Sequence, residues 1–337
     1  MSATTTDIRQ SRETSRWGWT ASLLQRQGAL AALVALILFG VLRYGENFYS
    51  EYNIQEILRY NAMFGLIALG MTFVIMTGGI DLSVGATAAL SSVVLALLSP
   101  HGAWIAIFGA VGAGLAVGLI NGTIISFFRI QPFIVTLAML LAARGVALFL
   151  ADNTNVYVDF ESGFMDIDRE QIGPVPMRVA ILIAAFAIGS VLLNFTRFGR
   201  HVLAVGGNEE AARLAGLPIG RILLAVYAMS GGLAGLAGVL LAWQTATGAP
   251  TEGIGWELSA IAAVVIGGTL LTGGMGSVGT TLVGAILLGL IFNILNFENG
   301  KGVISLSSYW QTVIRGLILL IVVLLQNRLG RRLVNPA

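Results

Sequence analysis

Residues 103–128 read AWIAIFGAVGAGLAVGLINGTIISFF and contain no charged side chain. A helix that crosses a bilayer needs about 20 predominantly apolar residues, so this stretch predicts a membrane span. The rest of the chain has the same character, because 56% of its 337 residues are hydrophobic and 11% are charged, against about 25% in soluble domains. So few polar side chains do not cover a water-exposed surface. The composition argues against a soluble enzyme and predicts an all-α, polytopic membrane protein.

The apolar runs of the sequence predict about ten transmembrane helices. They lie at 28–44, 54–76, 82–99, 103–128, 132–151, 177–195, 220–246, 257–272, 277–296 and 306–326. Two of these runs are weak as spans. The first is barely long enough, and the run at 257–272 is short and ends in glycine-rich sequence. We expect it to be a broken or re-entrant helix, which membranes tolerate only where it is buried in protein or lines water.

The charged residues predict which side of the membrane each loop occupies. Arginines in residues 1–27, a segment without a signal-peptide cleavage pattern, place the N-terminus in the cytoplasm, and ten crossings return the C-terminal tail 327–337 there. The cytoplasmic segments of this topology hold most of the 19 basic residues: Arg9, Arg12, Arg16, Arg26, Arg129, Arg197, Arg200, Arg213, Arg221, Arg328, Arg331 and Arg332. The outer segment 152–176 carries acids: Asp152, Asp159, Glu161, Asp166, Asp168 and Glu170. Residues 28–326 thus form one membrane domain, and lipid headgroups explain the basic residues better than nucleic acid does.

Several kinds of chemistry are absent from the sequence. There is no cysteine and there are only two histidines, His101 and His201, so thiol catalysis and a histidine metal cluster within one subunit are excluded. The single lysine, Lys301, lies outside any Walker A pattern. Residues 274–279 match G-x-G-x-x-G, but a membrane helix follows where a dinucleotide site needs a βαβ unit. We therefore expect no catalytic residue, no metal and no cofactor on this chain. If ATP drives it, another polypeptide hydrolyses the ATP.

Two short segments of the chain have similar sequences and are called here the echo segments. Residues 77–85, TGGIDLSVG, resemble residues 272–279, TGGMGSVG, and we expect each to follow a shorter helix and to open a longer one at a cytoplasmic junction. Transporters are often built from two related halves that meet at the pathway. The echo therefore predicts two pseudo-repeated halves, with Gly78, Gly79, Gly273 and Gly274 as junction residues. The alternative is coincidence in a glycine-rich chain.

Charged residues and glycines inside the spans have competing interpretations. Asp81 is interpreted as a cap for the helix that follows it, with ion or proton coupling as the alternative. Arg144 is expected to pair with a group of carbonyls, or else to contact a polar permeant, while Arg59 and Arg315 reach an interface. Glycines also recur four positions apart within the spans, and this spacing predicts close helix packing. They are Gly114, Gly118, Gly122, Gly231 and Gly235.

Residues 206–218, GGNEEAARLAGLP, read as a short capped helix in a cytoplasmic loop. Asn208 is the natural N-cap, Glu209 and Glu210 suit the first turn, Gly216 suits the left-handed stop and Pro218 the exit. Embedding in a membrane does not explain such a helix. Its alanines, among them Ala211 and Ala212, give it a face of small side chains, and we interpret it as a docking element for a partner. The alternative is a well-ordered loop without a partner.

Residues 70–85, GMTFVIMTGGIDLSVG, carry a family resemblance. This stretch is similar to the signature of ribose-type sugar ABC importer permeases, and residues 130–133, 206–208 and 263–269 agree with it. The resemblance covers residues 54–326. Within the family, residues 196–200 and 294–310 look closest to permeases for galactofuranose.

The resemblance implies a mechanism and a set of partners. Two permease subunits, identical or paralogous, form the pathway in the bacterial inner membrane. Two cytoplasmic ATPases with ATP and Mg²⁺ bind below, and a periplasmic sugar-binding protein binds above. The segment 197–221 then carries the coupling helix, with Gly207, Asn208, Glu209, Ala211, Ala212 and Gly216 facing the ATPase. A sugar path needs polar groups and aromatic faces, for which the candidates are Asn61, Phe64, Gln131, Phe133, Trp243, Gln244 and Asn293.

Three other functions compete with a sugar importer. A permease for branched-chain amino acids or nucleosides shares the broader superfamily. An ion-coupled carrier or channel working alone needs buried paired carboxylates, and none is clearly placed in the sequence. An intramembrane enzyme lacks a recognisable nucleophile.

Overall fold

The computed structural model describes residues 28–300 and isolated positions between 310 and 324. The expected span 306–326, Arg315 and both tails lie wholly or largely outside these residues. The helices in chain order are Gly28–Tyr44, α2 (Glu46–Tyr49), α3 (Glu51–Met76), α4 (Val84–Leu98), α5 (Ala103–Phe128), α6 (Pro132–Leu150), α7 (Phe164–Arg169), α8 (Met177–Phe195), α9 (Arg197–Gly207), α10 (Glu209–Leu214), α11 (Ile219–Thr245), α12 (Trp256–Ile266) and α13 (Val278–Gly300). Two 3₁₀ turns cover Ser99–His101 and Phe160–Ser162.

Seven of the described helices are long and apolar enough to cross a membrane, which confirms a polytopic helical protein; the expected total of about ten is not confirmed. The helices Gly28–Tyr44 and α12 are shorter. At 1.5 Å per residue, the 11 residues of α12 rise about 16 Å, half of a hydrocarbon core of about 30 Å. The run expected at 257–272 is therefore a short helix that does not span on its own.

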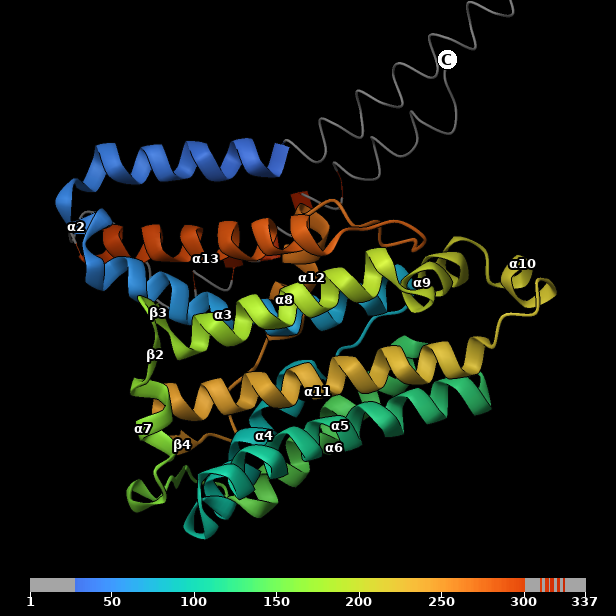
Figure 1. Ribbon diagram of the computed structural model, residues 1–337, viewed down its shortest axis with the longest axis horizontal. Helices are drawn as coiled ribbons and strands as arrows, with labels where there is room; N and C mark the ends of the chain where they lie inside the picture. The colour runs from blue at the N-terminus through green and yellow to red at the C-terminus, as the bar shows by residue number, and fades with distance from the viewer. Residues whose placement is uncertain are drawn as a thin grey trace, which may run out of the picture.

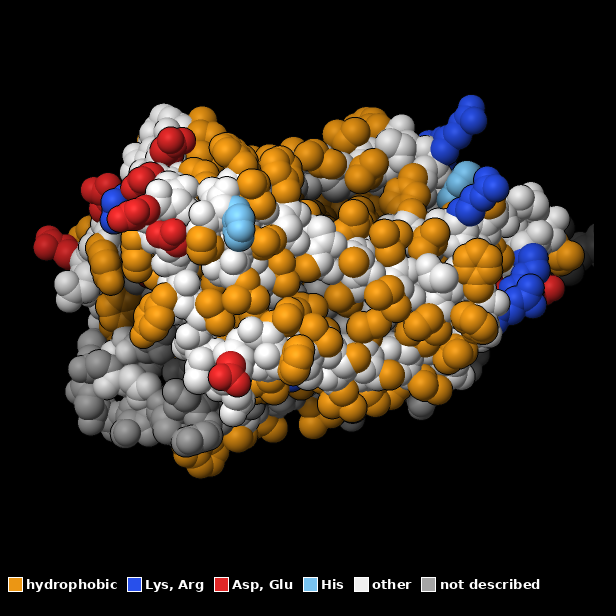
Figure 2. Space-filling view, turned by 90° about the horizontal axis from the view of Figure 1, so that it is seen from below, with side chains coloured by type: hydrophobic (Ala, Val, Ile, Leu, Met, Phe, Trp, Pro, Cys, Tyr) orange, Lys and Arg blue, Asp and Glu red, His pale blue; other side chains and the backbone are white. Residues whose placement is uncertain are grey.

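The long helices lie side by side between two chemically different ends (Figure 1). One end, here called the acidic end, holds α7 and the short strands, and it carries the acids of residues 152–176. The other, the basic end, holds α9 and α10 with their arginines. Figure 2 shows acidic side chains at the first end, basic ones at the second and mostly apolar side chains between them. This charge separation is what the positive-inside rule expects if the basic end faces the cytoplasm.

Short strands close the acidic end. Strand β1 (Val156–Tyr157) pairs antiparallel with β4 (Thr247–Gly248), and β2 (Gln171–Ile172) pairs with β3 (Val175–Pro176). The Trp243 indole N–H donates to the Phe164 carbonyl at 2.9 Å, and the two rings stack. These contacts attach the loop that follows α6 to the end of α11.

Helix α11 lies at the centre of the bundle and packs closely against α5. A Cβ atom on Gly114 would lie 2.6 Å from the Cα atom of Gly235, and one on Gly122 would lie 2.9 Å from the Cα atom of Leu224. Backbones approach this closely only because these positions lack side chains. The close helix packing predicted from the glycine spacing is therefore confirmed.

The two echo segments meet at the basic end, but the helices around them differ from the expectation. Helix α3, before the first segment, has 26 residues, and α4, after it, has 15. The prediction that a shorter helix precedes a longer one is therefore wrong for the first segment and holds for the second, where α12 with 11 residues precedes α13 with 23. Helix α4 begins beside the middle of α11, since Asp81, three residues before it, bonds to Ser230 of that helix. Relatedness of the two halves stays a prediction.

Candidate functional site

Five glycines from three distant segments form one contact at the basic end. This glycine junction consists of Gly78, Gly206, Gly207, Gly273 and Gly274. A Cβ atom on Gly273 would lie 2.8 Å from the Gly78 nitrogen and 2.9 Å from the Gly206 oxygen, and one on Gly274 would lie 2.7 Å from the Gly207 Cα atom. The Gly274 N–H donates to the Met76 carbonyl at 2.9 Å. The junction joins the end of α9 to both echo segments, backbone against backbone.

Helix α10 follows the junction directly and has the predicted caps. The Asn208 side chain accepts from the Ala211 N–H at 2.9 Å, and Arg213 pairs with Glu209 at 2.6 Å. Gly216 has φ of +79°, the left-handed conformation that ends a helix. The segment therefore forms a short helix that projects from the basic end (Figure 1).

The exposed face of α10 differs from the expected one at one residue. Ala212 is buried within this chain, at 4% exposed, because its methyl group faces the core. Ala211 is exposed, and so is Leu214, at 82%. The sequence reasoning missed Leu214, although a leucine in the last turn of a polar helix was the available signal. Leu214 thus adds one large apolar side chain to the exposed surface of this projecting helix.

Asp81 lies in the loop before α4, whose N-cap residue is Ser83. Its Oδ1 accepts from the Ser83 N–H at 3.0 Å and from the Ser83 hydroxyl at 2.6 Å, and its Oδ2 accepts from the Ser230 hydroxyl at 2.8 Å. Asn121 donates to the Ser83 hydroxyl oxygen at 3.0 Å. The carboxylate thus joins the loop before α4 to α11. The interpretation of Asp81 as a helix cap is wrong, because it accepts from Ser83 two residues on, as in an Asx turn, and α4 has no side-chain cap bond. Gly79 lies beside it, against the Tyr227 ring.

Arg144 meets a pair of carbonyls, as one interpretation of the sequence proposed. Its guanidinium donates to the carbonyl oxygens of Pro250 and Glu252, in the loop that precedes α12. Arg59 pairs with Glu56 at 3.6 Å, one helical turn away.

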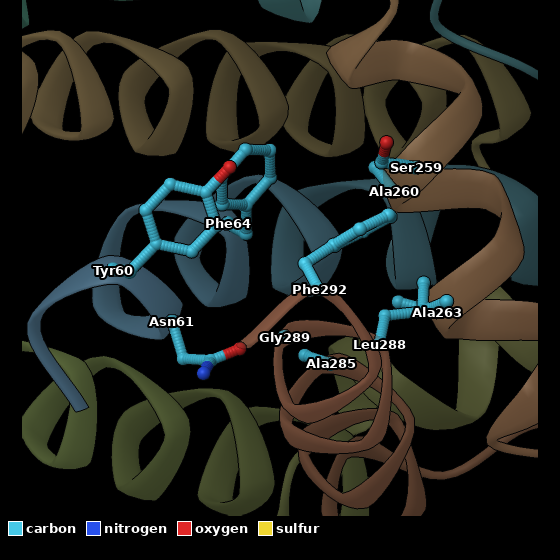
Figure 3. Close-up of a pocket in the computed structure, with 10 residues that line it drawn as sticks. All are labelled: Tyr60, Asn61, Phe64, Ser259, Ala260, Ala263, Ala285, Leu288, Gly289 and Phe292. Carbon is cyan, nitrogen blue, oxygen red and sulfur yellow. The ribbon is translucent and has the colours of Figure 1, made fainter. Parts of the chain in front are cut away.

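The candidate pathway residues do not gather in one place. Asn61 and Phe64 line the same small cavity between α3, α12 and α13, with Tyr60, Ser259 and Phe292 among its walls (Figure 3). Its volume is about 20 Å³, room for roughly one water molecule. Within the described part of the chain, the Asn61 side-chain oxygen has no hydrogen-bond partner.

The other candidates are spread along the molecule. Asn293 donates to the Asn53 side-chain oxygen at 2.8 Å, also between α3 and α13. Gln131 and Phe133 are exposed near the basic end, where Gln131 lines a cleft beside α10. Gln244 is exposed at the acidic end, and Trp243 is buried there.

Comparisons with known proteins agree with this architecture. The family model described as "Branched-chain amino acid transport system / permease component" matches residues 53–323. Ribose import permease proteins of Escherichia coli strain K12 and Bacillus subtilis strain 168 are each 38% identical, over 92% and 91% of this chain and 96% and 94% of their own lengths. The L-arabinose ABC transporter permease of Azospirillum brasilense is 38% identical over 91% of this chain and 89% of its own. The chain therefore belongs to the ABC permease family that this model describes, among its ribose-type members.

Proposed function

We propose that this chain is the membrane subunit of an ATP-driven monosaccharide importer in a bacterial inner membrane. Two permease subunits, copies or paralogues, form the pathway. A periplasmic binding protein delivers the sugar at the acidic end, and separate ATPase subunits bind Mg-ATP at the basic end. In this topology both tails of the chain lie in the cytoplasm.

One observation carries the proposal: α10 projects from the basic end and is joined through the glycine junction to both echo segments. A partner that pushes on Leu214 or Ala211 moves α9, and Gly206 and Gly207 of α9 contact Gly273 and Gly274 directly. A projecting helix with a backbone connection to the interior suits the transmission of force from an ATPase. Gly207, Asn208, Glu209, Ala211 and Gly216 remain the proposed coupling residues, and Leu214 joins them.

The substrate class follows from the relatives, which are import permeases for ribose and L-arabinose. Galactofuranose remains a proposed substrate because of the resemblance at residues 196–200 and 294–310. Thr196, the first of these residues, caps α9 at the basic end. A branched-chain amino acid is the second candidate, favoured by the description of the family model.

The test is uptake by cells that produce this chain with its neighbouring ATPase and binding-protein genes. Labelled D-ribose, L-arabinose, galactofuranose and leucine are supplied in parallel, and the ATPase is used intact or with its Walker lysine replaced. We expect uptake of one monosaccharide that disappears in the lysine variant. Sugar uptake that persists in that variant, or uptake of leucine alone, refutes the proposal.

A further inference from the structure

The chain between β4 and α12 turns back into the middle of the bundle. A Cβ atom on Gly248 would lie 2.6 Å from the Cα atom of Val93, and one on Gly253 would lie 2.9 Å from the carbonyl carbon of Gly85. Helix α4 ends at Leu98, where the next residue bonds to the acidic-end loop. At 1.5 Å per residue, Gly85 lies about 20 Å inward from that end, which is near the middle of a bilayer.

The loop at this depth is irregular and exposed. Residues 251–255 form turns rather than helix, and Thr251, Glu252 and Ile254 are exposed, the last at 74%. Non-helical backbone at membrane depth is tolerated only where protein buries it or where it lines a water-filled cavity. The described part of the chain leaves these residues open, so water or a second subunit covers them, and lipid does not.

Charged side chains surround the same loop. Arg144 bonds to the Pro250 and Glu252 carbonyls, and the carboxylates of Glu252 and Glu257 are the acids whose charge acts on it. The Glu257 carboxylate also approaches Gly85, since a Cβ there would lie 3.1 Å from Oε2. Ionisable groups inside a membrane face the protein interior or a water-filled cavity and mark substrate pathways. Arg144 lies on α6, the least buried of the seven described spanning helices, so this surface faces away from the chain's own core.

We infer that loop 250–255, with Glu252 and Glu257, lines the aqueous route of the permease and that these carboxylates accept hydrogen bonds from sugar hydroxyls. Carboxylates only accept and hydroxyls donate, so the chemistry is complementary. Arg144 is a positioning residue for the loop, because its guanidinium already donates to the loop carbonyls. The inference rests on the proposed function for the identity of the permeant, but not for the presence of water.

Cysteine labelling tests the inference cleanly, because the natural chain has no cysteine. Glu252→Cys and Ile254→Cys are made in the full transporter in membrane vesicles and treated with a charged, water-soluble methanethiosulfonate reagent. Ile188→Cys is the matched control, since Ile188 is 61% exposed and lies about 16 Å along α8 from the acidic end. Tyr157→Cys, in the acidic-end loop, shows that the reagent works.

We expect both loop variants to react at least tenfold faster than Ile188→Cys. We also expect the monosaccharide found in the uptake panel to slow the reaction of Ile254→Cys, which keeps both proposed carboxylates. Loop variants that react as slowly as Ile188→Cys overturn the aqueous route, and fast labelling that the transported sugar leaves unchanged overturns the hydroxyl contact. If no sugar is transported, the proposed function fails, and the labelling rates alone still decide whether water reaches the loop.

Discussion

Gly206 and Gly207, at the end of α9, are expected to respond differently to substitution by alanine. In Gly206→Ala the new methyl carbon would lie 2.6 Å from the Gly274 nitrogen and closer still to the Met76 carbonyl oxygen. In Gly207→Ala it meets no atom of the described residues within 4 Å. Ordinary contacts between carbon atoms lie at about 3.5–4.0 Å. The opposing atoms are backbone atoms that bond to each other, so they do not rotate away as a side chain does. Overpacking of this kind costs about 1–3 kcal/mol, and a rigid backbone places Gly206→Ala near the upper value.

A cost of about 3 kcal/mol corresponds to roughly a hundredfold change in an equilibrium constant. We therefore expect Gly206→Ala to lower both the thermal stability of the solubilised transporter and its uptake per assembled complex by tenfold or more. Gly207→Ala is expected to keep the thermal stability of the natural protein, since the described structure leaves room for its methyl group. Uptake rates are normalised to the amount of membrane-inserted protein. Equal behaviour of the two variants would refute the tight junction.

Three further substitutions test α10 and the start of α4. Leu214→Asp should leave insertion intact, because the side chain is 82% exposed within this chain, but should reduce uptake and co-purification of the ATPase at least tenfold if α10 docks on it as proposed; unchanged co-purification contradicts docking. Asn208→Ala removes the cap acceptor and should destabilise α10 by about 1 kcal/mol, giving a partial loss of uptake that Asn208→Asp restores. Asp81→Asn disturbs a buried group that accepts three hydrogen bonds, so assembly should fall at a cost of about 1–3 kcal/mol. A shift in the pH profile of uptake with normal assembly would favour proton coupling instead.

The helical membrane fold followed from the sequence because apolar length is a local property. Residues 103–128 need no knowledge of their neighbours to be recognised as a span. The capped helix after Asn208 was also predictable, since its caps lie within a few residues of each other. The start of α4 was not, because its depth is set by Gly85 packing against Gly253, which is far away in the chain.

The candidate site was predictable only where sequence spacing settles geometry. Asn61 and Phe64 share a cavity because residues three apart lie on one helical face. Residue type alone suggests Trp243 and Gln131, because the nearly uniform hydropathy around the long helices leaves no signal for which face meets the pathway. Ala212 shows the same limit, since packing of α10 against the rest of the chain decides which of its alanines is covered.

Helix α12 connects the two functional regions. Its N-terminal end carries Glu257 beside loop 250–255, and the loop beyond its C-terminal end enters the glycine junction at Gly273. A Cβ on Gly267 would lie 2.6 Å from the Thr280 oxygen, so α12 is pressed against α13 without room to slide separately. We therefore expect a displacement of α9 to reach Glu257 as a movement of the α12–α13 pair. Glycine at each close contact is then what lets backbones transmit the movement directly, since side chains at those positions would hold the segments apart.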